Sequence, residues 1–328
     1  MERRYRAVAV LFSAAKQAGL FPARLLGPAR AFIDTRAVGP PRPVAARRRG
    51  LFAADRYWAA AFATPYAAVF SIFVIYPIGY GLWLGSDPAS YRALFADPVY
   101  LRTVTNTLLY LLFGVNLKLA LALLLSGFFM RRGWWFKLLL VVFMLPWAIP
   151  ALPSYLSINW MLNGQWGLIN NIVWMLFQID GPPWLDRPNL ALASVIYAHI
   201  WKWMPFWTLI FLAGRMAIPR ELYESADVDG ASGVQKFAHV TLPLMAGLYL
   251  VCTLLSTIWA LGDFNAVRFV SGGGPALSTH VLATLGIRNA FELGDPRLGM
   301  ATVLTALPLL IPLVILLMRQ LRRTQVTI

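Results

Sequence analysis

The sequence predicts an all-α integral membrane protein, and three observations support this fold class. Hydrophobic residues make up 59% of the 328 residues and charged residues only 13%, a composition far from that of a soluble globule. Aromatic residues alone reach 14%, which excludes a disordered chain. Charge-poor stretches long enough to cross a bilayer as helices recur along the chain.

Six such stretches predict six transmembrane helices, within residues 57–86, 103–130, 138–179, 188–214, 237–262 and 298–318. The third stretch exceeds one span, and its second half is polar, so its helix is expected to end near Leu162 with an outer or interfacial segment after it. Pro146, Pro150 and Pro153 interrupt the backbone ladder there. They predict a bent helix beside a transport pathway; the alternative is a kink that only improves packing.

The basic residues indicate the orientation. Alternating the loops between two sides places 21 of the 29 Lys and Arg residues on one side and 6 on the other, with Lys118 and Lys202 inside spans. By the positive-inside rule, both termini are cytoplasmic. The net charge of +15 therefore reflects topology, and no nucleic-acid partner is expected.

Three segments are predicted: a tail over residues 1–56, a permease domain over 57–319 with a cytoplasmic loop at 215–245, and a cytoplasmic tail over 320–328. The first segment loosely resembles a signal peptide, but cleavage would leave Arg47, Arg48 and Arg49 outside. It is expected to be a basic, disordered cytoplasmic tail; the alternative is a start codon assigned too early.

The loop at residues 215–245 has the pattern of two short helices. Pro219 and two glutamates favour a helix start, and Gly230 suits the left-handed residue that ends a helix over 220–229. Ser232 and Gln235 have the spacing of a capping box, which predicts a second helix that Pro243 then bounds before the fifth span.

Four acidic residues in this loop predict a protein-facing surface: Glu221, Glu224, Asp227 and Asp229. The inner leaflet is negative, so acids on the cytoplasmic side do not favour lipid contact. Small neighbours, among them Ser225, Ala226 and Ala231, allow a partner to approach closely. The alternative is an ordinary solvated loop.

The run from Glu224 to Ser232, with Phe237 and Thr241-Leu242-Pro243 after it, resembles the EAA loop of ABC importer permease subunits. More closely, the chain resembles the carbohydrate-uptake permeases of the maltose and glycerol-phosphate type, over about residues 59–318. Other parts of the resemblance are Pro146 to Pro150 with Trp160, Gly167 and Asn170; Trp201 with Pro205-Phe206; Gly273-Gly274-Pro275 with Ser278-Thr279; and Ala290-Phe291. Ser225 and Ser271 replace the alanine and threonine usual in the family, and the basic extension has no counterpart.

The resemblance implies the type I importer fold in a bacterial inner membrane. The implied partners are a second permease subunit, two ATPase subunits that use ATP and Mg, an extracytoplasmic binding protein, membrane lipid, and a sugar or polyol. The first short helix would be a coupling helix seated in the ATPase. The residues implied for that contact are Glu224, Ser225, Ala226, Asp229, Gly230 and Ala231.

Catalytic motifs are missing from the sequence. It holds no phosphate-binding loop, no nucleophile elbow and no zinc motif, and its single cysteine and three histidines form no metal-ligand pattern. The chain is therefore expected to be non-catalytic, to bind no cofactor or metal, and to rely on a partner for ATP hydrolysis. The rival interpretation is an autonomous ion-driven carrier or channel.

Two further groups of residues are candidates. Lys118, Lys202, Trp259, Asp263 and Asn265 are candidate pathway residues, because intramembrane charges usually face the interior and a ring beside polar groups suits sugars. The alternatives are lysines that snorkel to an interface and an interfacial aromatic belt. Gly273, Gly274 and Pro275 predict an outer turn that faces a binding protein, or else a simple flexible turn. The sequence does not identify the sugar, nor whether the second permease is a copy of this chain.

Overall fold

The computed structural model describes residues 48–326, with the side chains of residues 57–322. The chain divides into two units, Met1–Phe73 and Val74–Ile328. The first unit contains helix α2 (Arg48–Phe70), and the π-helical turn η5 (Ser71–Ile75) contains the boundary between the units. The predicted N-terminal tail is thus helical from Arg48 onward, and its residues 1–47 lie outside the described residues.

The second unit is built from helices over its described part, residues 74–326. These are α3 (Tyr76–Leu84), α4 (Pro88–Ala96), α5 (Pro98–Leu109), η6 (Tyr110–Val115), α6 (Asn116–Phe129), α7 (Trp134–Ala148), α8 (Ala151–Met161), α9 (Leu168–Phe177), α10 (Pro188–Met216), α11 (Arg220–Val228), α12 (Gly233–Lys236), η7 (Phe237–Thr241), α13 (Leu242–Leu261), α14 (Asn265–Val270), α15 (Leu282–Ile287), η8 (Arg288–Glu292), α16 (Pro296–Leu304) and α17 (Leu307–Val326). The predicted tail 320–328 is helical as far as Val326.

Four helical stretches among the described residues are long and apolar enough to cross a bilayer: Tyr57–Leu84, Pro98–Phe129, Gly233–Leu261 and Pro296–Arg322. The bent pair α7 and α8 adds a fifth crossing if it counts as one span. These stretches coincide with five of the six predicted windows. The remaining window is α10, a helix of 29 residues that does not meet the same criterion.

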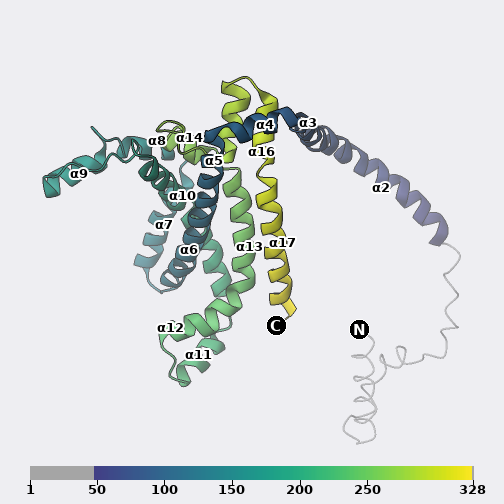
Figure 1. Ribbon diagram of the computed structural model, residues 1–328. Coiled ribbons are helices and arrows are strands. Elements are labelled where there is room, and N and C mark those ends of the chain that lie inside the picture. Colours follow the sequence, from purple (N-terminus) through teal and green to yellow (C-terminus); the bar gives the residue numbers. More distant parts are fainter. Residues whose placement is uncertain (1–47, 327–328) are drawn as a thin grey trace, which may run out of the picture. The chain divides into compact units, whose positions relative to one another are not determined.

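Helix α10 lies at the centre of the second unit (Figure 1) and packs against α6, α7, α8, α13 and α14. Val195, Ala198 and Phe211 of α10 are fully buried, as are Leu119 and Ala122 of α6. Small residues such as alanine let helices in a membrane approach closely. At one end of the unit α11 and α12 project beyond α10 and α13, whereas α4, α14 and α16 lie at the opposite end (Figure 1).

The third predicted span is bent, as expected. Helix α7 ends at Ala148, α8 begins at Ala151, and their axes differ by 95°. The residue before a proline avoids helical geometry, and Ile149 before Pro150 has ψ 139°. Helix α8 ends at Met161 with Leu162 as its C-cap, which confirms the expected end of this helix.

The prediction that Pro243 separates the loop from the fifth span was wrong. Helix runs without a break from Gly233 to Leu261, through the π-helical turn η7 just before Pro243. A proline inside a regular helix removes one hydrogen bond and clashes with a carbonyl one turn earlier. A π-helical turn changes the backbone register at that point, so the helix tolerates the proline.

Candidate functional site

Helices α11 and α12 form an acidic hairpin, residues 220–236, at one end of the second unit. Gly230 has φ +76°, which confirms its predicted left-handed conformation. The backbone closes α11 there, because Ala231 N donates to Ala226 O over 2.9 Å and Asp229 N donates to Ser225 O over 3.1 Å. The predicted capping box is also confirmed, with Ser232 and Gln235 bonding reciprocally.

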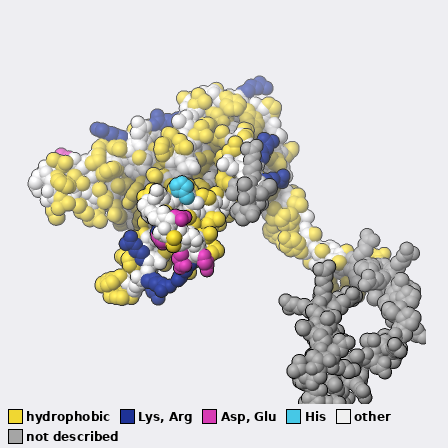
Figure 2. All heavy atoms as spheres, turned by 90° about the horizontal axis from the view of Figure 1, so that it is seen from below, with side chains coloured by type: hydrophobic (Ala, Val, Ile, Leu, Met, Phe, Trp, Pro, Cys, Tyr) yellow, Lys and Arg dark blue, Asp and Glu magenta, His cyan; other side chains and the backbone are white. Residues whose placement is uncertain are grey.

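The exposed surface of the hairpin combines acids with apolar side chains. Glu224, Ser225, Asp229 and Gly230 are exposed, and Ala226 and Ala231 are half-buried. Val228 is 89% exposed and Val234 78%, which the sequence pattern alone did not identify as exposed. Figure 2 looks onto this end of the molecule and shows acidic side chains gathered over the hairpin. An apolar patch rimmed by charges is typical of a protein-binding surface.

One side-chain contact joins the two helices of the hairpin, and a second joins α11 to η7. Lys236 Nζ of α12 lies 2.5 Å from the Asp227 carboxylate of α11. The Tyr223 hydroxyl lies 2.9 Å from Thr241 Oγ1, and Thr241 is buried at the end of η7. The hairpin is therefore joined to the helix that continues as α13.

Lys202 does not snorkel to an interface. It is 3% exposed in the middle of α10, and its ammonium donates to Pro146 O over 2.6 Å, to Ile149 O, and to Ser154 Oγ over 3.2 Å. Two of these acceptors are carbonyls that the break between α7 and α8 leaves without helical partners. A cation is favoured at such a helix C-terminus, so Lys202 stabilises the bend.

Replacing Lys202 with methionine is expected to destabilise the protein by about 1–3 kcal/mol, because the carbonyl acceptors lose their donor. The measurement is the midpoint of thermal unfolding in detergent. Lys137, which is exposed at the start of α7, provides the matched control. Equal midpoints for Lys202→Met and Lys137→Met would contradict a stabilising role for the buried ammonium.

Lys118 is also buried, at 2% exposure, and belongs to a polar network across three helical segments. Lys118 Nζ lies 2.8 Å from His199 Nε2, and His199 Nδ1 lies 2.8 Å from Asp263 Oδ2. The Tyr110 hydroxyl donates to the same carboxylate oxygen over 2.7 Å. Buried charges are tolerated when they are paired and hydrogen-bonded, and this network meets both conditions.

Lys118 and Asp263 were predicted from the sequence as candidate pathway residues, whereas His199 and Tyr110 were not. A histidine within a predicted span was an available signal, since ionisable residues there usually face the interior of the protein. Tyr110 carried no such signal, because tyrosine is common in spans. Only the packing of η6 against α10 and the end of α13 shows that the four groups meet.

Trp259, Asp263 and Asn265 do not form one exposed surface. The Asp263 side chain is only 10% exposed and faces His199. Trp259 is 48% exposed and packs against three aromatic rings of α10, those of Trp203, Phe206 and Trp207, with centroids 5.6–6.0 Å away. Asn265 is exposed at the start of α14. Trp259 and Asn265 thus remain accessible, whereas the carboxylate does not.

The glycine loop, residues 271–280, is an ordered turn. Ser271 Oγ lies 2.8 Å from Thr279 Oγ1, which lies 2.8 Å from Gly274 O. Gly272 and Gly273 both have positive φ, and Gly273 is buried against the His280 ring, where a Cβ would collide. Gly274 and Pro275 are half-buried. These contacts join the two ends of the loop and favour an ordered turn.

The loop is anchored to α5 by the Asn106 amide, which donates to Ser278 O over 2.7 Å and to His280 O over 3.0 Å. Burial lowers the pKa of His280 to about 4, so the ring is neutral at physiological pH. The neutral His280 ring packs directly on the Gly273 backbone and so holds the two ends of the loop together.

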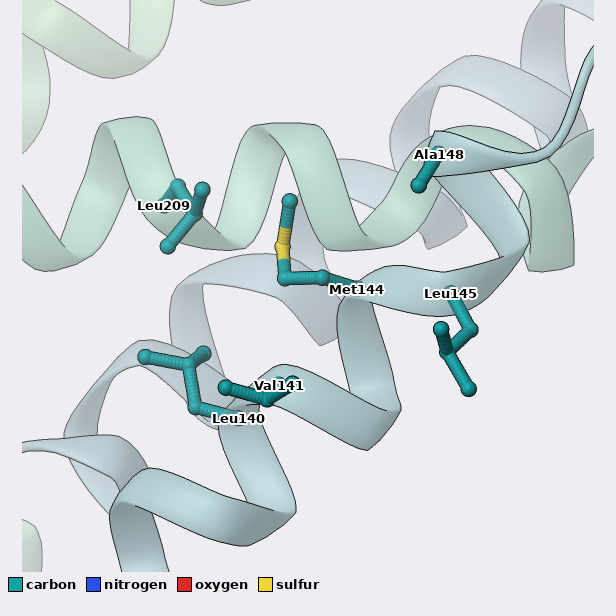
Figure 3. Close-up of a pocket in the computed structure, with 6 residues that line it drawn as sticks. All are labelled: Leu140, Val141, Met144, Leu145, Ala148 and Leu209. Atoms are coloured by element: carbon teal, nitrogen blue, oxygen red, sulfur yellow. The ribbon is translucent and has the colours of Figure 1, made fainter.

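An apolar groove of about 340 Å³ lies between α7 and α10 (Figure 3). It is lined by Leu140, Val141, Met144, Leu145, Ala148 and Leu209. Ligand sites for polar molecules carry several converging hydrogen-bonding groups, and these six side chains offer none. This groove is therefore not a sugar site.

Comparison with known proteins adds a family match. Residues 118–325 match the family described as "Binding-protein-dependent transport system inner membrane component". The matched region contains the acidic hairpin, the buried lysines and the glycine loop.

Similar proteins include three sugar-transport permeases. The chain is 34% identical to the sulfoquinovosyl glycerol transport system permease protein SmoG of Agrobacterium fabrum, over 82% of this chain and 92% of that protein. It is 37% identical to the trehalose/maltose transport system permease protein MalF of Thermococcus litoralis, over 56% of this chain and 61% of that protein. It is 29% identical to the lactose transport system permease protein LacF of Rhizobium radiobacter, over 68% and 79%.

Solved structures show the same fold. A chain of a bacterial ABC transporter that imports the acidic polysaccharide alginate aligns with TM-score 0.70 and 23% identity, over 84% of this chain and 99% of that chain. A chain of the alginate transporter in complex with its alginate pentasaccharide-bound periplasmic protein aligns with TM-score 0.73 and 21% identity, over 81% and 94%.

Proposed function

Because the chain belongs to the family of binding-protein-dependent transport system inner membrane components, we propose that it carries a sugar or related polyol across the membrane in an ATP-driven importer. As a member of this family, it is a multi-pass inner-membrane permease subunit without catalytic activity or a cofactor of its own. The energy for transport must then come from another subunit.

Six spans are proposed, with both termini cytoplasmic. The span that the hydropathy criterion leaves out is α10, whose 29 residues measure about 43 Å at 1.5 Å per residue. This length exceeds the hydrocarbon thickness of a bilayer. The polar side chains that lower its apolar content, among them His199 and Lys202, are buried within the protein and do not face lipid.

The acidic hairpin carries the proposal. It is the docking surface for a cytoplasmic ATPase, with α11 as the coupling helix. Glu224 and Asp229 offer exposed carboxylates, and Ser225, Ala226 and Ala231 allow close approach. Gly230 closes the helix in the left-handed conformation that this turn requires.

The proposed complex contains a second permease subunit, two ATPase subunits that hold ATP and Mg, and an extracytoplasmic binding protein. The glycine loop lies at the end of the unit opposite the hairpin (Figure 1) and is the proposed contact for the binding protein. Gly274 and Pro275, both half-buried, are the proposed contact residues, next to the buried Gly273.

A sugar or polyol as substrate is supported by the relatives, which are named for sulfoquinovosyl glycerol, trehalose or maltose, and lactose. Within the pathway, the accessible ring of Trp259 and the exposed Asn265 are the proposed contacts. Lys118, Lys202 and Asp263 would hold the pathway helices in place from within the protein. An autonomous ion-driven carrier would have no use for the hairpin, so that interpretation is disfavoured.

The proposal is tested by tagging the C-terminus, solubilising native membranes gently, and identifying the bound proteins by mass spectrometry. Recovery of an ATPase and a second permease is expected. Both should be reduced or lost when Glu224→Ala and Gly230→Val are combined. Recovery of this chain alone, under conditions that preserve other importers, would contradict the proposal.

A further inference from the structure

Arg215 lies at the point where the acidic hairpin meets the helical bundle. It is 9% exposed in the last turn of α10, just before the segment that leads into α11. Few arginines are buried without a carboxylate partner. Among the contacts of the described residues, no carboxylate lies beside the Arg215 guanidinium. Its guanidinium instead joins two other helices.

The first contact is with α6. Arg215 Nη2 donates to Leu123 O over 3.1 Å, and Nη1 lies so close to Gly127 that a Cβ there would collide with it. The missing side chain at Gly127 therefore makes room for the guanidinium against the helix backbone. Leu123 O also accepts from Ser126 Oγ over 2.6 Å.

The second contact is with η7. The Arg215 guanidinium carbon lies 5.3 Å from the centre of the Phe237 ring, within the range of a cation–π interaction. Phe237 is the first residue of η7 and follows α12 directly. Arg215 Nε is buried without a hydrogen-bond partner, so the guanidinium depends on the ring and on α6 for its stabilisation.

These contacts extend to the coupling helix. Tyr223 of α11 bonds Thr241 at the other end of η7, and Asp227 of α11 pairs with Lys236 beside Phe237. A displacement of α11 must therefore move η7, and η7 bears on α6 through Arg215. Coupling between distant sites is carried by such contiguous contacts when the elements they join have two arrangements.

We infer that Arg215 is a positioning residue that transmits movement of the acidic hairpin to α6. The inference rests on the proposed function, in which an ATPase moves the hairpin. It adds a specific route by which movement of the hairpin reaches α6, through the Phe237 ring and the Arg215 guanidinium.

Two single-cysteine reporters separate docking from transmission. The only native cysteine of this chain, Cys252, is buried, so within this chain an introduced cysteine can be labelled selectively, and the label is read on this chain after the subunits are separated. Val228→Cys reports on the hairpin, since Val228 is 89% exposed, and Met130→Cys reports on the end of α6, since Met130 is 41% exposed. The full complex in inverted membrane vesicles is labelled with an impermeant maleimide, without nucleotide or trapped with ATP and vanadate.

Trapping is expected to change the labelling rate about threefold or more at both positions. In Arg215→Met the change at position 228 should persist and the change at position 130 should disappear. Phe237→Leu keeps an apolar side chain without the ring, and it should likewise keep the labelling change at position 228 and lose the one at position 130. If Arg215→Met does not accumulate, the Phe237→Leu result tests the inference. Lys137→Met, which removes an exposed cation, should leave both changes intact.

A change at position 130 that persists in full in Arg215→Met, or in Phe237→Leu, would overturn the inference. So would a complex with native Arg215 in which position 228 responds and position 130 does not. A complex in which neither position responds would instead contradict the proposed docking of the hairpin on an ATPase.

Discussion

Replacing Gly230 with valine is expected to reduce uptake by more than about tenfold. Gly230 has φ +76°, and a β-branched residue is a strong outlier in that region, at a cost of about 1–3 kcal/mol. No atom lies within 4 Å of a Cβ built at this position, so the effect arises from the backbone and not from crowding. The turn that closes α11, the proposed coupling helix, would be lost.

The measurement is initial-rate uptake, in cells, of the sugar that the extracytoplasmic binding protein of the complex carries. Gly233→Val is the matched control, because Gly233 lies nearby in the same hairpin with equally open space but without a positive φ. Gly230→Asn should keep most of the uptake, since asparagine tolerates the left-handed region. Undiminished uptake in Gly230→Val would remove the proposed role of this turn.

Replacing Asp263 with alanine is expected to destabilise the protein by about 3 kcal/mol, because two buried hydrogen-bonding groups lose a charged acceptor. The carboxylate accepts from Tyr110 over 2.7 Å and lies 2.8 Å from His199 Nδ1. Without it, Lys118, His199 and Tyr110 are left in a buried network that contains no carboxylate. Tyr110 and His199 are almost fully buried, so the protein offers no other acceptor at the position of the lost carboxylate.

The check is the thermal unfolding midpoint of the purified protein in detergent. Asp180→Ala removes an exposed carboxylate after α9 and should leave the midpoint nearly unchanged. Asp263→Asn keeps an oxygen acceptor, so its unfolding midpoint should lie between those of Asp263→Ala and Asp180→Ala. If Asp263→Ala and Asp180→Ala unfold at the same temperature, the network contributes no stability.

Local patterns were sufficient to predict much of this molecule. Charge-poor windows indicated helical spans, since a helix that crosses a bilayer needs a run of apolar residues whatever its neighbours are. The acidic hairpin was equally accessible, because a glycine that closes a helix and a serine with glutamine three residues later act within one or two turns of backbone. The break in the third span followed from its prolines in the same way.

Contacts between distant segments decided the rest. From the sequence, Lys118 and Lys202 could either face the interior of the protein or snorkel to an interface. The packing of α10 against α6 and α7 shows that both are buried, Lys118 beside His199 and Lys202 beside the Pro146 carbonyl. Three other residues contact partners that lie more than 60 positions away along the chain. These are His199, Tyr110 and Arg215. Where a flexible charged side chain finds its partner depends on which helices meet, and composition and periodicity do not specify that.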